Sequence, residues 1–263
     1  MNLLAILIAF GVFHWLGKPK ILQSFGWWSA MLNFTQKQSW LKPDWLKAFV
    51  LLMLPVLMVA IISHFLQQRH DHQLWYLILN CVVLYYCLGP QQLEIDAKKM
   101  LTAEESESDD MQWLVVKLTD EAIRRWFLII FWFVVLGAAG AMLSRLTIHS
   151  QQHKNFTDAG LSKALYALLS YPVIWLMTLS LLVASDFDRI WRHCKRYLKR
   201  QNWYWQHRSL LYEAMDFAVE NCEIEDYQSD NPQTVRNTTL SVLKRMLMVW
   251  LVLVAFIVIF TIG

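Results

Sequence analysis

The chain has 263 residues, of which 56% are hydrophobic and 17% are charged, and it contains 14 tryptophans. Soluble domains carry about a quarter of charged residues, and the apolar residues here come in long blocks, so the composition argues against a soluble globular protein and for an integral membrane protein. The formal net charge of +3 is small, and we expect the lipid bilayer rather than nucleic acid as a partner.

Six apolar segments follow one another along the chain and predict membrane helices. They cover about residues 2–16, 48–66, 74–89, 126–144, 164–184 and 246–262. The first and third are short, because 15 residues of helix rise only about 23 Å against about 30 Å of hydrocarbon. We therefore expect a single all-α membrane domain over residues 1–263, a bundle of five or six transmembrane helices.

The first apolar segment has the composition of a signal peptide but the opposite polarity. Lys18 and Lys20 follow its apolar stretch, whereas a signal peptide carries its basic residues before that stretch and a small-residue cleavage site after it. We therefore interpret residues 2–16 as a retained helix whose N-terminus lies outside.

Loop charge favours six crossings that alternate in direction. The polar segments 17–47, 90–125 and 185–245 hold 5, 5 and 10 Lys and Arg residues, whereas the two other loops hold 1 and 3. Positive charge is retained in the cytoplasm, so these three segments are predicted to be cytoplasmic loops with amphipathic helices, in a bacterial inner membrane. Arg145 belongs to one of the two sparsely charged loops and is predicted to lie outside.

Tryptophans lie near the ends of the apolar segments, where an amphipathic ring favours the headgroup layer. The five at these boundaries are Trp15, Trp45, Trp75, Trp126 and Trp250. Residues 17–47 combine further tryptophans with five lysines, which is typical of a helix that lies on the membrane surface.

The fourth apolar segment, RWFLIIFWFVVLGAAGAMLSRL, loses its bulky side chains before it ends. Lipid provides no hydrophobic drive between helices, so association relies on close contact, which small residues permit. Gly137 and Gly140 therefore indicate a surface where a helix or ligand approaches the backbone. Arg145 follows, and it is suited either to anchoring at the interface or to facing the bundle interior as an intramembrane cation. These three residues are the candidate ligand contacts.

A basic amphipathic helix is predicted directly after the fifth apolar segment. Ile190, Trp191, Cys194, Tyr197 and Leu198 recur at helical spacing and form its apolar face, and the remaining surface carries the cations Arg189, Arg192, Lys195, Arg196, Lys199 and Arg200. Such a helix attracts anionic lipid by roughly 1 kcal/mol per basic residue, and it also suits a phosphorylated or carboxylate-bearing ligand. Asp186 and Asp188 stand at its start, where carboxylates cap free amides.

Motifs for catalysis are absent from the sequence. There is no phosphate-binding loop, dinucleotide fingerprint or nucleophile elbow, so we predict no catalytic residue and no cofactor. The four cysteines lack zinc spacing and are interpreted as small buried side chains. The run HFLQQRHDH places His64, His70, Asp71 and His72 in one short turn, which is more typical of a solvated loop than of a metal site.

Three stretches give the chain a family resemblance. LYYCLGP (84–90), RWFLIIFWFVVLGAAGAMLSRL (125–146) and YPVIWLMTLSLLVASDFD (171–188) are similar in order and spacing to segments of the AmpE family. That family consists of inner-membrane proteins associated with induction of chromosomal β-lactamase, encoded beside the amidase AmpD, and it resembles the CobD/CbiB membrane enzymes of cobalamin synthesis. The likeness covers the chain from about residue 75 to the end.

The chain departs from the cobalamin enzymes at positions that matter for their chemistry. Those enzymes follow the arginine with an Asn-Thr-Leu-Asp-Ser run, where this chain keeps Arg145 but continues Leu146-Thr147-Ile148-His149-Ser150. They later carry Pro-Ala-Arg, where this chain has Pro172-Val173-Ile174. Joining a carboxylate to an amine with ATP needs groups that bind phosphate and metal, so the missing acid and arginine disfavour an amide synthase.

The resemblance therefore implies a non-enzymatic inner-membrane regulator of β-lactamase induction or muropeptide recycling. Its implied partners are a muropeptide or the proteins of cell-wall recycling and β-lactamase regulation. Two alternatives stay open: a CobD/CbiB-like amide synthase, and a small carrier for cell-wall fragments. Carriers tend to have broken helices near the middle of the membrane.

Overall fold

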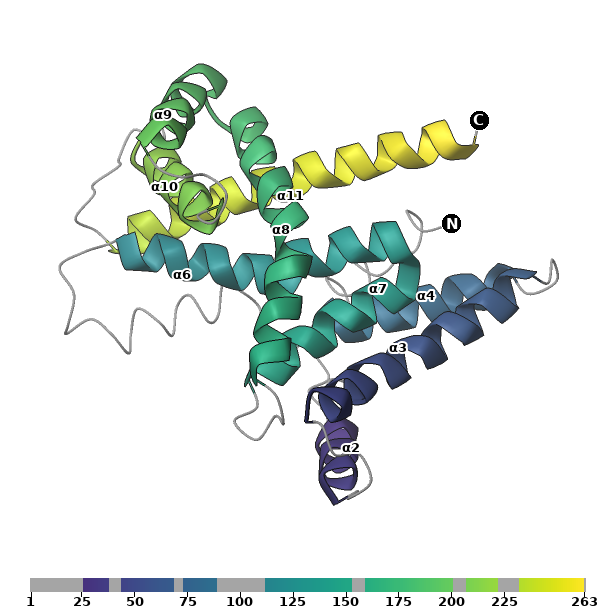
Figure 1. The fold of residues 1–263 in the computed structure, drawn as a ribbon. Helices are drawn as coiled ribbons and strands as arrows, with labels where there is room; N and C mark the ends of the chain where they lie inside the picture. Colours follow the sequence, from purple (N-terminus) through teal and green to yellow (C-terminus); the bar gives the residue numbers. More distant parts are fainter. Residues whose placement is uncertain are drawn as a thin grey trace. The chain divides into compact units, whose positions relative to one another are not determined.

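The computed structural model describes residues 26–37, 44–68, 73–88, 112–152, 159–200, 207–221 and 232–262 (Figure 1). Within these ranges every residue is helical except Ser185, Asp186 and Asn221, and no strand occurs. The helices are α2 (Gly26–Lys37), α3 (Asp44–Gln68), α4 (Gln73–Leu88), α6 (Gln112–Ala122), the π-helical turn η2 (Ile123–Phe127), α7 (Leu128–Gln152), α8 (Ala159–Ala184), α9 (Phe187–Arg200), α10 (His207–Glu220) and α11 (Pro232–Ile262).

Four helical stretches of the described chain are long and apolar enough to cross a membrane. They are Trp45–Gln68, Gln112–Gln152, Gly160–Ala184 and Pro232–Phe256, and the shorter Gln73–Leu88 is also apolar. The predicted all-α membrane class is thereby confirmed for the described residues, and these stretches indicate a multi-pass membrane protein. The predicted first segment, 2–16, lies outside the described residues.

The helices extend beyond most of the predicted apolar segments. The segment predicted at 48–66 lies in α3, and the segment predicted at 164–184 lies in α8. The last segment was expected to begin at 246, but α11 already begins at Pro232. Polar residues that precede an apolar stretch continue the same helix there, because hydropathy marks the lipid-facing part of a helix and not its first turn.

The chain divides into two compact units. Unit 1 comprises Met1–Pro90 and Leu128–Ser170, and unit 2 comprises Gln91–Phe127 and Tyr171–Gly263. In unit 1, α3, α4 and α7 pack on one another and α2 packs on α3 (Figure 1). Leu51, Leu52, Leu84 and Phe133 are fully buried in these helices.

Helix α7 reverses direction at Gly137, as Figure 1 shows. Gly137 has φ 67° and ψ −152°, a region open essentially to glycine alone. A Cβ on Gly140 would collide with the backbone carbonyl of Trp132, eight positions earlier, which is possible only because the chain folds back. The 126–144 segment is therefore not the single straight helix that the hydropathy predicts.

In unit 2, α6 packs on α10 and α11, and α10 packs on α9 and α11. The Phe127 and Trp250 rings meet edge to face with centroids 5.1 Å apart, and Trp250 Nε1 donates a hydrogen bond to Ser180 Oγ at 3.2 Å. Trp250 is only 5% exposed, so its ring packs inside the protein; its predicted place in the headgroup layer stays a prediction. Trp45 and Trp75 are exposed, as that layer requires.

Candidate functional site

Five residues of unit 1 gather around the end of α7, and we call them the Arg145 cluster: Trp27, Trp28, Tyr86, Arg145 and His149. Trp27 Nε1 donates a hydrogen bond to Tyr86 Oη at 2.7 Å. The Trp27 and Trp28 rings lie edge to face at 5.9 Å, and the Trp28 and His149 ring centroids are 6.3 Å apart. The cluster thus joins α2, the end of α4 and the second half of α7.

Arg145 is the cation of this cluster. Its side chain is half-buried with Nε shielded from solvent, and its charge acts on the side chains of Tyr86 and Cys87 at the end of α4. Of the two roles that its sequence position suggested, this placement fits a cation that faces neighbouring helices. An anchor at the interface, whose head would point into water, stays the alternative prediction for Arg145.

The reversal at Gly137 is what brings Arg145 to this end of unit 1. Loop charge predicted that Arg145 lies outside while residues 17–47, which include α2, lie inside. The structure places His149 and Arg145 beside α2 and the end of α4, so the two predicted sides meet at one end of the unit. The prediction that Arg145 lies outside and α2 inside concerns the two sides of a membrane and stays a prediction. The proximity of Arg145 to α2, which follows the reversal at Gly137, gives a reason to test it.

The predicted glycine contacts have separate structural roles. Gly137 provides the backbone conformation of the turn, and Gly140 provides room for the carbonyl of Trp132. The close approach that small residues were expected to permit is therefore made by the preceding half of the same segment. Trp132 also ties this hairpin to α8, since its Nε1 donates to the carbonyl of Leu169 at 3.0 Å. Ligand binding at these glycines stays a prediction.

The basic helix of the sequence is α9, and most of its cations point outward. Arg189, Arg192, Lys195, Arg196 and Lys199 are exposed, while Arg200 ends the helix and its side chain lies outside the described residues. Ile190 and Cys194 are buried, as the predicted apolar face requires. Trp191 departs from that face, because it is 46% exposed.

Carboxylates at the start of α9 hold its first arginines. Asp186 Oδ1 accepts a hydrogen bond from the Arg189 backbone amide at 3.4 Å, which confirms the predicted cap. Asp186 also pairs with Arg189 at 3.0 Å, and Asp188 pairs with Arg192 at 2.7 Å. These exposed pairs contribute little stability; their effect is to hold the arginine side chains close to the helix.

Helix α9 is fixed to α10 through a mixed aromatic and polar contact. The His193 ring stacks on Phe217 with centroids 4.3 Å apart, and its Nε2 lies 3.9 Å from a Glu213 carboxylate oxygen. Burial raises the pKa of the thiol of the next residue, Cys194. Cys194 is therefore a poor nucleophile, in agreement with its interpretation as a small core side chain.

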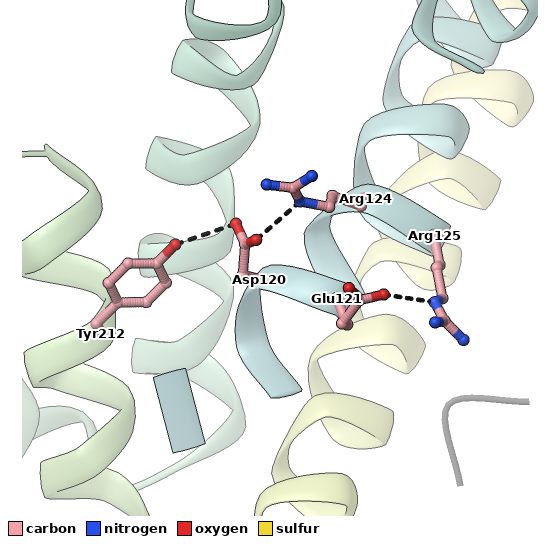
Figure 2. Close-up of polar contacts among 5 residues, drawn as sticks. All are labelled: Asp120, Glu121, Arg124, Arg125 and Tyr212. Atoms are coloured by element: carbon pink, nitrogen blue, oxygen red, sulfur yellow. Dashed lines mark hydrogen bonds and ion pairs between the residues drawn. The ribbon is translucent and has the colours of Figure 1, made fainter. Parts of the chain in front are cut away.

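A polar network at the start of the π-helical turn escaped the sequence interpretation (Figure 2). Arg124 Nε pairs with Asp120 Oδ2 at 2.8 Å, and Arg125 Nε pairs with Glu121 Oε2 at 2.8 Å. The Tyr212 hydroxyl of α10 donates to Asp120 Oδ1 at 3.2 Å. The acid–base spacing of four residues was a visible signal for both ion pairs, but nothing in the sequence pointed to Tyr212. π-Helical turns are frequent at functional sites.

Metal ligands do not converge anywhere in the described part of the chain. No group of three His, Cys, Asp or Glu side chains that could hold an ion occurs there. Of the HFLQQRHDH run, His64 contacts Gln68 at 3.0 Å, whereas His70, Asp71 and His72 lie outside the described residues. No protein-family model, curated protein or solved structure matches the chain.

Proposed function

We propose that this protein is an inner-membrane regulator similar to the AmpE family, and that it modulates β-lactamase induction or muropeptide recycling without catalysing a reaction. The observation that carries the proposal is the Arg145 cluster. It is built on RWFLIIFWFVVLGAAGAMLSRL, the most specific stretch of the resemblance, and that stretch has the reversal at Gly137.

The chemistry of the Arg145 cluster suits a muropeptide. Such a ligand combines sugar rings, which pack against aromatic faces, with peptide carboxylates, which a guanidinium binds through paired hydrogen bonds. Trp27 is partly exposed and next to Tyr86, and Arg145 lies at the same end of α4. The half-buried guanidinium is only partly screened by water, so a carboxylate that reaches it is attracted more strongly than at a free surface.

A binding measurement tests the ligand assignment. The full chain in an uncharged detergent is titrated with a muropeptide of N-acetylmuramic acid and a tripeptide, by calorimetry. We expect Arg145→Gln to weaken binding about tenfold or more, because one charge-assisted hydrogen bond contributes roughly 1.5–3 kcal/mol, and Arg145→Lys to retain part of the affinity. Lys163→Gln removes an exposed charge of the same unit and serves as the control; equal losses in Arg145→Gln and Lys163→Gln contradict the assignment.

Regulation is tested in a bacterium with an inducible chromosomal β-lactamase. The chain's own gene is deleted and then restored as wild type or as Arg145→Gln, and β-lactamase activity is measured before and after a β-lactam inducer. We expect the deletion to change the induction ratio and Arg145→Gln to fail to restore it at equal membrane abundance. An unchanged ratio after deletion contradicts the proposed regulation.

A carrier for cell-wall fragments is the second candidate, and one observation favours it. Substrate sites of carriers lie at discontinuous helices near the membrane midplane, and the helix that contains Gly137 is discontinuous. Saturable uptake of a labelled muropeptide into vesicles that contain the protein supports the carrier. Binding without uptake supports the regulator.

We propose five membrane crossings and one re-entrant hairpin. The crossings are the apolar segments 2–16, 48–66, 74–89, 164–184 and 246–262, and the hairpin is 126–152. From Trp126 to Leu136 the hairpin's first arm has eleven residues and rises only about 16 Å, against about 30 Å of hydrocarbon. A helix that turns back at that depth leaves the membrane on the side where it entered. With the N-terminus outside, this topology places residues 185–245 and their 10 Lys and Arg residues outside, in contrast to the cytoplasmic place that loop charge predicts.

A further inference from the structure

A cavity of about 280 Å³ lies in unit 2, where α8 ends and α9 begins. Its polar lining is Ser185, Asp186 and Arg189 from this junction, Asn221 from the end of α10 and Arg245 from α11. Phe217 of α10 contributes to the apolar part of its wall. Four segments thus meet around one small polar space, just below the usual range of about 300–1,000 Å³ for ligand pockets, so the cavity suits a compact polar group.

The cavity has a surplus of positive charge. Arg189 is partly neutralised, because its Nε lies 3.0 Å from Asp186 Oδ2. Among the described residues no carboxylate forms an ion pair with Arg245. Two arginines and one aspartate therefore line the same space. Asn221 donates its side-chain amide to the carbonyl of Phe217 at 2.8 Å, so this donor is used at the end of α10.

The cavity also lies where apolar helices give way to polar sequence. The membrane-capable part of α8 ends at Ala184, and in α11 Lys244 and Arg245 directly precede the apolar run that begins at Met246. Phe187 and Trp191 are 57% and 46% exposed on α9, and their rings stack with centroids 6.3 Å apart. Exposed aromatic rings at the end of apolar helices favour the headgroup layer, the level at which lipid phosphates lie.

We propose that this cavity binds a phosphate group, supplied either by the headgroup of an anionic lipid or by a free phosphorylated compound. Arg189 of α9 and Arg245 of α11 hold the phosphate oxygens, and the glycerol or other small substituent packs against Phe217. The role is specific to these two arginines. Arg196 lies on the same helix but outside the cavity lining, where its Nε donates to the carbonyl of Arg192.

The test uses the full chain in dodecyl maltoside, an uncharged detergent. Short-chain dioctanoylphosphatidylglycerol is titrated by calorimetry, with dioctanoylphosphatidylcholine as the lipid control and glycerol 3-phosphate as the free phosphate. We expect Arg189→Gln and Arg245→Gln each to weaken phosphatidylglycerol binding about tenfold or more, as the loss of a charge-assisted hydrogen bond predicts. Arg196→Gln makes the same charge change outside the cavity and should leave the affinity unchanged, and Arg245→Lys should keep part of it.

The outcomes separate the two sources of phosphate. Binding of phosphatidylglycerol that glycerol 3-phosphate does not displace assigns the cavity to a lipid headgroup, whereas binding of glycerol 3-phosphate with the same dependence on Arg189 and Arg245 assigns it to a free phosphorylated compound. Three results overturn the proposal: no binding of either, equal binding of phosphatidylcholine, or an equal loss with Arg196→Gln, which indicates diffuse attraction to α9. A thermal melt of each variant shows that the fold is intact.

Discussion

Two glycines three positions apart make the reversal of α7 possible, each for a different physical reason. At Gly137 the limit is the backbone, whose φ of 67° is unfavourable for any residue with a Cβ, although there is open space around it. At Gly140 the limit is space, because the carbonyl of Trp132 occupies the position of a Cβ. The two positions therefore respond differently to the same substitution.

Alanine substitutions test this distinction. We expect Gly137→Ala to destabilise the protein by about 1–3 kcal/mol through backbone strain, and Gly140→Ala by at least a similar amount, since a backbone carbonyl cannot move aside as a side chain can. Gly26→Ala meets no atom within 4 Å and should change stability by less than about 0.5 kcal/mol. Thermal unfolding in detergent, followed by tryptophan fluorescence, measures all three. A Gly140→Ala melt that coincides with that of Gly26→Ala contradicts the close packing at Gly140.

The burial of Cys194 predicts how fast its thiol is alkylated at a given pH. Because burial raises the pKa of this thiol, less thiolate is present at a given pH, and alkylation accelerates only at a more alkaline pH than for a free thiol. A variant with Cys81→Ser, Cys87→Ser and Cys222→Ser isolates the reaction. We expect alkylation by iodoacetamide at pH 8 to be slower in the folded protein than in denaturant by tenfold or more, and similar rates in both states contradict the burial.

The existence of the helices could be predicted from the sequence, but their ends could not. Long apolar runs predict α3, α8 and α11 because no polar backbone is tolerated in lipid outside a helix or a closed barrel. The start of α11 carried one usable signal, since Pro232 is suited to the first turn of a helix. No sequence signal indicated that the helix continues from α6 into α7. Arg124 and Arg125 were interpreted as the boundary of a membrane segment, and the residues before them as a loop.

The hydrogen bond between Asp120 of α6 and Tyr212 of α10 predicts how substitutions at these two residues change stability. Asp120 accepts from Tyr212 and pairs with Arg124, whereas Glu121 pairs only with Arg125 among the interactions that Figure 2 draws. We expect Tyr212→Phe and Asp120→Asn each to destabilise by about 1 kcal/mol, since the Asp120 and Arg124 side chains are partly exposed and solvent weakens the charge contribution. The double variant should lose less than the sum.

Glu121→Gln provides the control for this network, because it removes a carboxylate one position away without touching α10. We expect a loss of less than about 0.5 kcal/mol there. Denaturant unfolding in detergent measures each variant. Additive losses for Asp120→Asn and Tyr212→Phe indicate that the two side chains are not coupled and contradict the hydrogen bond across α6 and α10.

In the Arg145 cluster, one residue could be predicted from the sequence and its neighbours could not. Arg145 could be selected because a cation beside a small-residue stretch is unusual in an apolar segment. Its neighbours Trp28, Tyr86 and His149 could not be selected, since they are far apart in the chain and meet only because α7 turns back at Gly137. The charge count assumed that every apolar segment crosses the membrane, and the reversal at Gly137 is the reason to test that assumption for residues 126–144.

The reversal therefore makes a prediction about membrane sidedness within unit 1. His149 lies beside Trp28, so the end of α7 and the helix α2 should be accessible from one face, and the turn between α3 and α4 from the other. Single cysteines replace three exposed residues in a cysteine-free chain: Ala30→Cys in α2, Gln73→Cys at the start of α4 and Gln152→Cys at the end of α7. A membrane-impermeant maleimide is applied to intact spheroplasts and to inverted vesicles.

We expect Gln152→Cys and Ala30→Cys to label in the same preparation and Gln73→Cys in the opposite one. Six alternating crossings predict instead that Gln152→Cys labels together with Gln73→Cys. Labelling of Gln152→Cys with Gln73→Cys would therefore restore a full crossing at 126–144 and contradict the re-entrant hairpin. Because Gly137 makes the hairpin, Gly137→Ala in the Gln152→Cys chain supplies a second measurement: if the strained turn opens, labelling of Gln152→Cys should become mixed between the two preparations, while that of Gln73→Cys stays fixed.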